Sequence, residues 1–207
     1  GWSTQRNRLH IVSRYCKWLA RERLVLVNPA AELELPRLGI RLPRAILTAE
    51  EAERILAVPD VTTSLGVRDR AILEIFYSTG IRRTELARLA IRDIDIHRGV
   101  LSVWQGKGRK DRVVPIGERA LAWVAKYLAE VRPDLATPAD QGGLFLGVDG
   151  GTISPGYVGN LVARFIAAAD IGKTGSCHLF RHTMATLMLE GGADVRFVQE
   201  MLGHACL

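Results

Sequence analysis

Cysteine is scarce in this 207-residue chain, which has three, and no two of them form a C-x-x-C pair. An odd number without that spacing excludes a disulfide framework and an obvious zinc knuckle. No apolar run approaches the ~20 residues that a membrane-spanning helix needs. The first six residues lack the apolar core of a signal peptide. From these absences we expect a cytoplasmic protein with no membrane partner.

Acidic residues are rare in the first fifth of the chain, where residues 1–47 contain three against nine lysines and arginines. Residues 48–207 contain 19 of each sign, so the whole net charge of +6 arises from residues 1–47. A second basic stretch, residues 82–112, has nine basic and four acidic residues. Two such stretches favour a polyanion partner, because each neutralised phosphate releases counterions. Ordinary solvated surface is the alternative.

The hydrophobic periodicity predicts an α+β protein, mainly α, with one antiparallel hairpin. The proline- and glycine-containing stretch 35–44 has no periodicity and indicates an interdomain linker. A basic amphipathic helix is expected before it, over about 4–25 and ended by Asn28-Pro29. The other expected helices cover about 48–57, 70–79, 84–89, 117–131, 155–169, 177–190 and 194–202, and the expected strands are 100–104 and 112–116.

The sequence TGIRRTEL at 79–86 places Arg82 and Glu85 three positions apart at a helix start. At that spacing the carboxylate can hold the guanidinium in one orientation. A fixed guanidinium presents a planar fork that matches phosphate oxygens. A purely structural ion pair is the alternative.

The predicted hairpin tip is Gly106-Lys107-Gly108. Flanking glycines allow the backbone to approach another molecule and leave Lys107 free to reach it. This is not a phosphate-binding P-loop, because the G-x-x-x-x-G-K-S/T spacing is absent. A lysine here could bind a phosphate or donate a proton, although most turn lysines do neither.

The sequence SCHLFRH at 176–182 places His178 and Arg181 on one face of a helix's first turn, with Ser176 as the expected N-cap. That end has free N–H groups and a positive dipole, which favour an anion. A histidine and an arginine together could bind a phosphate and exchange protons with it. His182 raises zinc binding as a less favoured alternative, since no third ligand is evident. The last motif, LGH, places His204 just after a helix stop.

The order of these motifs, TGIRRTEL, GKGRKDR, HLFRH and LGH, resembles the tyrosine recombinases of the phage integrase family, especially their Xer-like and integron-integrase branch. The resemblance covers about residues 45–207. It implies a helical DNA-binding domain, a linker and a catalytic domain of helices and strands, which together form a clamp around DNA. On that basis residues 1–35 would be the last part of the helical domain, 36–47 the linker, and 48–207 the catalytic domain.

The resemblance also implies the roles of two arginines and a glutamate. Arg82 would be the first catalytic arginine and Arg181 the second, both binding the scissile phosphate. Glu85 would support Arg82. We expect further DNA contacts from the second basic stretch and from the polar side of helix 155–169. The residues assigned to DNA binding are Arg83, Arg109, Lys110, Arg112, Tyr157, Asn160 and Arg164.

By the same resemblance, Lys107 would protonate the departing 5′ oxygen, His178 would assist proton transfer, and His204 would bond a nonbridging oxygen. The family reaction joins a tyrosine to the 3′ phosphate and keeps the bond energy for rejoining. The attack passes through a pentacovalent phosphorane, which positive side chains can stabilise without metal, ATP or another cofactor. Expected partners are double-stranded DNA and other protomers in a tetrameric synapse.

One departure from the family pattern concerns the nucleophile. Family members have the tyrosine about nine positions after the LGH histidine, and the printed sequence ends three residues after His204. We therefore expect a chain truncated before the nucleophile, inactive in cleavage as given. The alternatives are a DNA-binding module without catalysis, a type IB topoisomerase and, more distantly, a metal-dependent nuclease.

Overall fold

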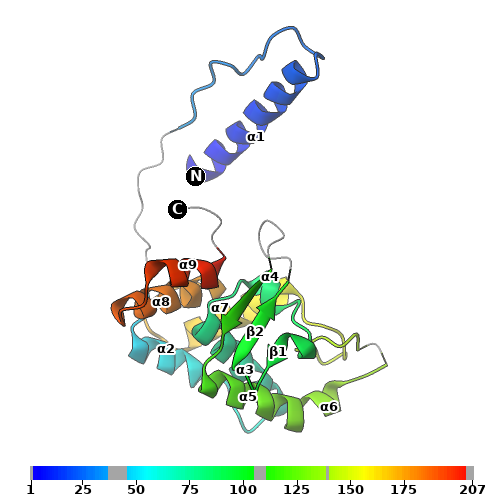
Figure 1. Cartoon of the computed structure of the whole chain (residues 1–207), viewed down its shortest axis with the longest axis vertical. Coiled ribbons are helices and arrows are strands. Elements are labelled where there is room, and N and C mark those ends of the chain that lie inside the picture. Colours follow the sequence, from blue (N-terminus) through cyan, green and yellow to red (C-terminus); the bar gives the residue numbers. More distant parts are fainter. Residues whose placement is uncertain (1, 37–45, 105–110, 139, 204–207) are drawn as a thin grey trace. The chain divides into compact units, whose positions relative to one another are not determined.

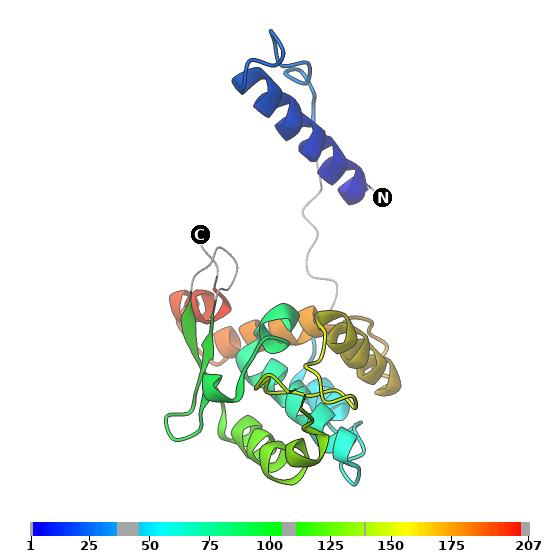
Figure 2. The ribbon, with the colours of Figure 1, turned by 90° about the vertical axis from the view of Figure 1, so that its right-hand side faces the viewer.

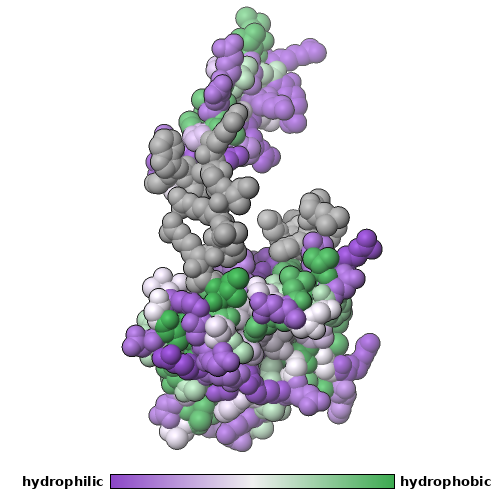
Figure 3. All heavy atoms as spheres, turned by 90° about the vertical axis from the view of Figure 1, so that its left-hand side faces the viewer, coloured by the Kyte–Doolittle hydropathy of each residue, from purple (hydrophilic) through white to green (hydrophobic). Residues whose placement is uncertain are grey.

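The computed structural model of the chain describes residues 2–36, 46–104, 111–138 and 140–203. The chain divides into two compact units, Gly1–Arg44 and Ala45–Leu207 (Figure 1). The first unit contains α1 (Trp2–Arg21), and none of its residues between 4 and 36 is buried. Figure 3 shows hydrophilic side chains along this unit with apolar ones among them.

Helix α1 ends earlier than the sequence indicated. The expected end was Asn28-Pro29, but the helix stops at Arg21. Arg23 adopts a left-handed conformation with φ of 58°. The Leu24 N–H then bonds the Leu19 carbonyl, and the Arg23 N–H bonds that of Ala20. This pair of bonds is the Schellman closure, which satisfies the last carbonyls without a glycine.

The second unit is mainly helical with a small antiparallel sheet, so the predicted α+β class is confirmed (Figures 1 and 2). In the part of the chain that is described, no helix is long and apolar enough to cross a membrane. The elements are α2 (Ala49–Leu56), α3 (Ser64–Thr79), α4 (Arg83–Leu86), the 3-10 helix η1 (Ile91–Asp93), β1 (Ile94–Asp95), β2 (Val100–Val103), β3 (Arg112–Pro115), α5 (Glu118–Glu130), α6 (Arg132–Leu135), α7 (Pro155–Ala168), α8 (Cys177–Glu190) and α9 (Val195–Leu202).

Local capping explains several helix boundaries. Thr48 and Glu51 form the reciprocal capping box at the start of α2. Ser154 caps α7, with Pro155 in its first turn, as predicted. Ser176 differs from the prediction, because it stands at the N-cap position of α8 without a capping bond. Its hydroxyl donates instead to the Gly159 carbonyl of α7 at 2.8 Å, so it ties two helices together.

Helix α3 runs through the core, packed against α5 and α8. Its apolar residues Ile72, Leu73, Ile75 and Phe76 are fully buried. Gly80 ends α3 in a left-handed conformation with φ of 58°. That reversal directs the chain into α4, which contains the last four residues of the TGIRRTEL motif.

The three strands are antiparallel in the order β1-β2-β3, and Val103 pairs with Arg112 at the end of the β2–β3 ladder. Leu101, Val103 and Val114 face the core. Helix α9 packs beside β3 (Figure 2). Strand β1 and helices η1 and α6 were not predicted, because elements of two to four residues are too short to show a period. The helix expected at 84–89 ends at Leu86.

Candidate active site

Arg82 immediately precedes α4, and Glu85 lies in its first turn. The Arg82 backbone N–H donates to Glu85 Oε2 at 2.8 Å, and its Nη1 donates to Oε1 at 2.7 Å. The contact indicated by the three-residue spacing is therefore present. Glu85 is buried, with 6% of its side chain exposed, whereas Arg82 keeps 19%.

A second guanidinium, that of Arg112, reaches Glu85 from the start of β3. Its Nη1 donates to Glu85 Oε1 at 3.0 Å and its Nη2 to Oε2 at 2.8 Å. Its Nε donates to the Met201 carbonyl at 2.7 Å. The carboxylate thus accepts four hydrogen bonds, two at each oxygen.

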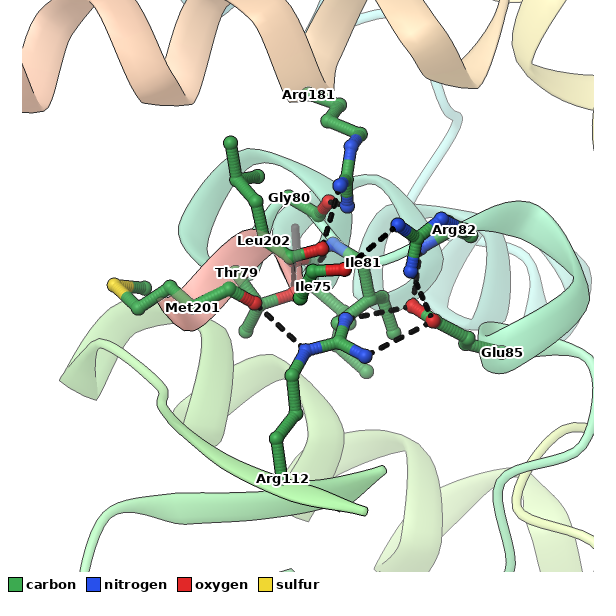
Figure 4. Close-up of polar contacts among 11 residues, drawn as sticks. Ile75, Thr79, Gly80, Ile81, Arg82, Glu85, Arg112, Arg181, Met201 and Leu202 are labelled. Atoms are coloured by element: carbon green, nitrogen blue, oxygen red, sulfur yellow. Dashed lines mark hydrogen bonds and ion pairs between the residues drawn. The ribbon is translucent and has the colours of Figure 1, made fainter. Parts of the chain in front are cut away.

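The third guanidinium belongs to Arg181, in the second turn of α8. Its Nη1 donates to the Gly80 carbonyl at 2.7 Å, and its Nη2 to the Leu202 carbonyl at 2.6 Å. Figure 4 shows Arg181, Arg112 and Arg82 arriving from α8, β3 and the start of α4 to meet around one point. We call Arg82, Glu85, Arg112 and Arg181 the arginine cluster.

The end of α9 is part of this arrangement. Its last carbonyls have no partner within the helix, and three of them accept from the arginine cluster. Arg112 bonds Met201, Arg181 bonds Leu202, and Arg82 bonds Gly203 at 3.3 Å. The negative end of the helix dipole faces the cations there, which is the favourable sense.

The charges of the arginine cluster do not balance, since it contains three guanidiniums and one carboxylate. Burial alone would raise the pKa of Glu85, but the hydrogen bonds from Arg112 and Arg82 outweigh it and lower this pKa to about 2. Burial, reinforced by the charges of Arg82 and Arg112, lowers the pKa of Arg181 to about 10. The cluster keeps a net charge of +2 that a bound anion can neutralise.

His178 lies in the first turn of α8, close to the arginine cluster, and is exposed at its surface. Partial desolvation, followed by the charges of His182 and Arg181, lowers the pKa of His178 from its ordinary value. The imidazole is therefore mostly neutral at pH 7 and able to accept a proton. Arg83, the first residue of α4, adds to the positive potential that lowers this pKa.

Four other expected DNA contacts are among the described residues: Arg83, which is exposed at the start of α4, and three residues of α7. Asn160 and Arg164 are exposed on α7. Tyr157 has another partner, since its hydroxyl accepts from Nη2 of the buried Arg68 at 2.6 Å. The Arg68 guanidinium also lies 5.4 Å from the centre of the Tyr157 ring.

Four of the expected site residues, Lys107, Arg109, Lys110 and His204, lie outside the described residues. Among the residues that are described, no three His, Cys, Asp or Glu side chains are grouped as metal ligands. The thiol of Cys177 is buried, which raises its pKa and disfavours the reactive thiolate.

Sequence reasoning assigned Arg112 to the DNA surface and missed its place in the arginine cluster. A signal existed, because Arg112 and the buried Val114 are two apart in a strand and so share a face. An arginine on a core-facing side needs partners inside the protein. The acceptors at the end of α9 are main-chain carbonyls, which leave no sequence signature.

Gly203 of the LGH motif has a geometric reason to be glycine. Its φ is 63°, and an added Cβ would lie 3.1 Å from Nη1 of Arg112. We expect Gly203→Ala to lower the free energy of unfolding by about 1–2 kcal/mol from backbone strain alone, and further through displacement of Arg112. Urea titration measures the change. Gly192→Ala is the matched control, because its φ of 86° gives the strain while nothing lies within 4 Å of the new Cβ. Equal losses for both variants would remove the role assigned to the Arg112 contact.

Comparison with known proteins agrees with this geometry. Residues 45–207 match the phage integrase family. Tyrosine recombinase XerC 2 of Ralstonia nicotianae is 53% identical over 204 residues, which cover 99% of this chain and 58% of that protein's length. The crystal structure of XerA recombinase aligns with a TM-score of 0.71 and 27% identity, covering 96% of this chain and 75% of that one. XerH site-specific recombinase bound to difH substrate, in a pre-cleavage complex, gives a TM-score of 0.68 at 27% identity, with coverages of 84% and 51%.

Proposed function

The chain belongs to the phage integrase family, and from this membership we propose that it is the catalytic part of a site-specific DNA recombinase, acting through a 3′-phosphotyrosyl intermediate. The observation that carries the proposal is the arginine cluster, in which two guanidiniums bond one carboxylate and a third, from α8, bonds the Gly80 carbonyl. A phosphodiester supplies the charge and the oxygen acceptors that this site favours.

In this mechanism Arg82 and Arg181 bind the nonbridging oxygens of the scissile phosphate. A tyrosine oxygen attacks phosphorus, and the 5′ oxygen leaves with a proton from Lys107. His178, which is mostly neutral at pH 7, assists proton transfer, and His204 bonds a nonbridging oxygen. The reverse reaction rejoins the strand, so neither metal nor ATP is needed. Glu85 keeps Arg82 in place throughout.

We propose that the nucleophilic tyrosine is encoded beyond Leu207, so that the chain as given binds DNA without cleaving it. The four tyrosines within the sequence lie in surroundings that do not suit a nucleophile. Tyr127 is fully buried, and its hydroxyl accepts from the Leu146 N–H at 3.1 Å. Tyr77 is half-buried under Arg119, and Tyr15 stacks on Trp18 in α1. Tyr157 accepts from Arg68.

The domain assignment follows the same proposal. Residues 1–35 would end a helical DNA-binding domain, 36–47 would be the linker, and 48–207 the catalytic domain. The absence of any buried residue between 4 and 36 supports this reading, because a helix without a core needs a larger domain to pack against. On DNA, several protomers would assemble into a tetrameric synapse in the bacterial cytoplasm.

The experiment that tests the function begins with the reading frame past Leu207. We expect a tyrosine about nine codons after His204, and the extended chain should then form a covalent protein–DNA adduct on a cognate site that survives denaturation. Exchange of strands between two such sites distinguishes recombination from the relaxation that a topoisomerase performs. An extended chain with the tyrosine but without an adduct would contradict the proposal and favour a DNA-binding module.

DNA binding by the 207-residue chain can be tested through its salt dependence. Removing two phosphate contacts in Arg109→Ala/Lys110→Ala should reduce the slope of log affinity against log salt by about 2. Fluorescence anisotropy on a short duplex measures both slopes. Lys126→Ala is the control. Lys126 is on α5, outside the expected interface, and its ammonium lies 3.9 Å from the Glu130 carboxylate. An unchanged slope in the double variant would exclude these residues from the interface.

A further inference from the structure

We propose that Arg112, instead of contacting DNA, is a positioning residue that holds Arg82 and the end of α9 in the arrangement that receives the phosphate. The inference rests on the proposed function for its catalytic consequence. Its structural part, the dependence of Arg82 on Arg112, rests on the contacts around Glu85 alone.

The first step is that Arg112 is committed within the protein. Nε, Nη1 and Nη2 each donate to an internal acceptor, either Glu85 or the Met201 carbonyl. Only 8% of its side chain is exposed, less than half the 19% of Arg82. Of the two arginines that bond Glu85, Arg112 is therefore the more enclosed.

The second step is that Arg112 fixes the orientation of Glu85. Two parallel bonds from a guanidinium fork hold a carboxylate in one plane, which a single bond does not. The same two oxygens accept from the backbone and the side chain of Arg82. Without Arg112, the carboxylate keeps only its two bonds from Arg82, so the carboxylate and the Arg82 guanidinium can move together.

The third step is that Arg112 joins three segments that carry other site residues. It is the first residue of β3, five positions after Lys107 in the sequence. Its bond to Met201 ties that strand to the end of α9, immediately before His204. Through Glu85 it reaches Arg82 (Figure 4). One side chain therefore joins the start of β3, the pair of Glu85 with the first arginine, and the end of α9.

Guanidinium NMR of the 207-residue chain tests the structural step without any chemistry. In the wild type, we expect resolved Nη proton signals for Arg82, because its bonds slow rotation of the group. In Arg112→Met these signals should merge or broaden, while those of Arg68 remain as an internal check on folding. Arg68 is suited to this, since it is buried in a separate network with Asp69, Leu146 and Tyr157.

A second variant covers the case in which Arg112→Met does not fold. Arg112→Lys keeps the charge but has no fork, so Arg82 should lose its resolved signals there as well. Arg196→Met, exposed in the first turn of α9, is the matched control and should leave them intact. Resolved Arg82 signals in folded Arg112→Met or Arg112→Lys would overturn the proposal.

Cleavage by the extended chain tests the catalytic consequence. Arg112→Met should lower the cleavage rate by about 100-fold, the scale of one lost transition-state donor, with DNA affinity changed by less than about 3-fold. On a site whose scissile phosphate is replaced by a neutral methylphosphonate, the rate loss caused by Arg112→Met should be several-fold smaller. The substrate then has less negative charge for Arg82 to stabilise. The same loss on both substrates would overturn a role through Arg82. A wild type without any adduct would contradict the proposed function, while the NMR result would still decide the role of Arg112.

Discussion

Arg181→Ala in the chain extended beyond Leu207 is expected to abolish covalent adduct formation while most of the DNA affinity remains. Arg181 is the member of the arginine cluster that comes from α8. In the proposed mechanism it binds a nonbridging phosphate oxygen whose negative charge grows in the transition state. Loss of such a group costs at least about 10³-fold in rate, or about 4 kcal/mol. In the proposed complex many other basic residues also contact the duplex, so binding should depend little on this one.

The loss in Arg181→Ala should not come from unfolding. Burial lowers the pKa of Arg181 from 12.5 to about 10, so keeping this side chain charged costs the folded state about 3 kcal/mol. Removing the charge relieves that cost and offsets the loss of the hydrogen bonds to the Gly80 and Leu202 carbonyls. We expect the thermal midpoint to shift by only a few degrees.

The measurements for Arg181→Ala are adduct yield on a denaturing gel, duplex affinity by anisotropy and the thermal midpoint. Arg196→Ala, exposed on α9, serves as the control and should leave all three unchanged. Parallel losses of affinity and adduct would show that Arg181 serves binding as a whole and not the reaction step.

Glu85→Gln is expected to give the largest loss of stability, about 3 kcal/mol at pH 7. The pKa of Glu85 is about 2 in the folded chain against an ordinary 4.5, and each unit is worth about 1.4 kcal/mol. Because the folded pKa is the lower one, this stability is fully present above pH 4.5. It declines as the pH falls through the folded value, and about half is left at pH 3.

Urea unfolding of wild type and Glu85→Gln at pH 7 and pH 3 measures this dependence, and the gap between the two proteins should narrow at the lower pH. Glu53→Gln is the control, because the Glu53–Arg119 pair is nearly half exposed and such pairs contribute at most about 1 kcal/mol. A gap that stays constant with pH would show that the carboxylate charge is not what stabilises the cluster.

Local patterns predicted the parts of the fold whose causes are local. The Arg82–Glu85 contact follows from helical spacing, the start of α2 from the Thr48 capping box, and the start of α7 from Ser154-Pro155. The predicted phosphate-binding chemistry likewise depends on motifs of a few residues.

What the sequence could not predict are the contacts between segments far apart in the chain. Arg112 and Met201 are 89 positions apart, and Arg181 and Gly80 are 101 apart. Ser176 shows the same limit, because a carbonyl of α7 competes successfully for the hydroxyl that local rules assign to the cap. The early end of α1 came from a left-handed arginine, a conformation that few non-glycine residues adopt.

The three hydrogen bonds at the end of α9 have a consequence for how this segment can diverge. Their acceptors are backbone oxygens, so exchanging one apolar side chain for another at Met201 or Leu202 leaves all three acceptors unchanged. Inserting or deleting one residue upstream in α9 would instead turn its end by about 100°, and every acceptor would point away from its guanidinium. The length of α9 is thus more tightly constrained than its composition, and homologous sequences should vary there by substitution without gaps.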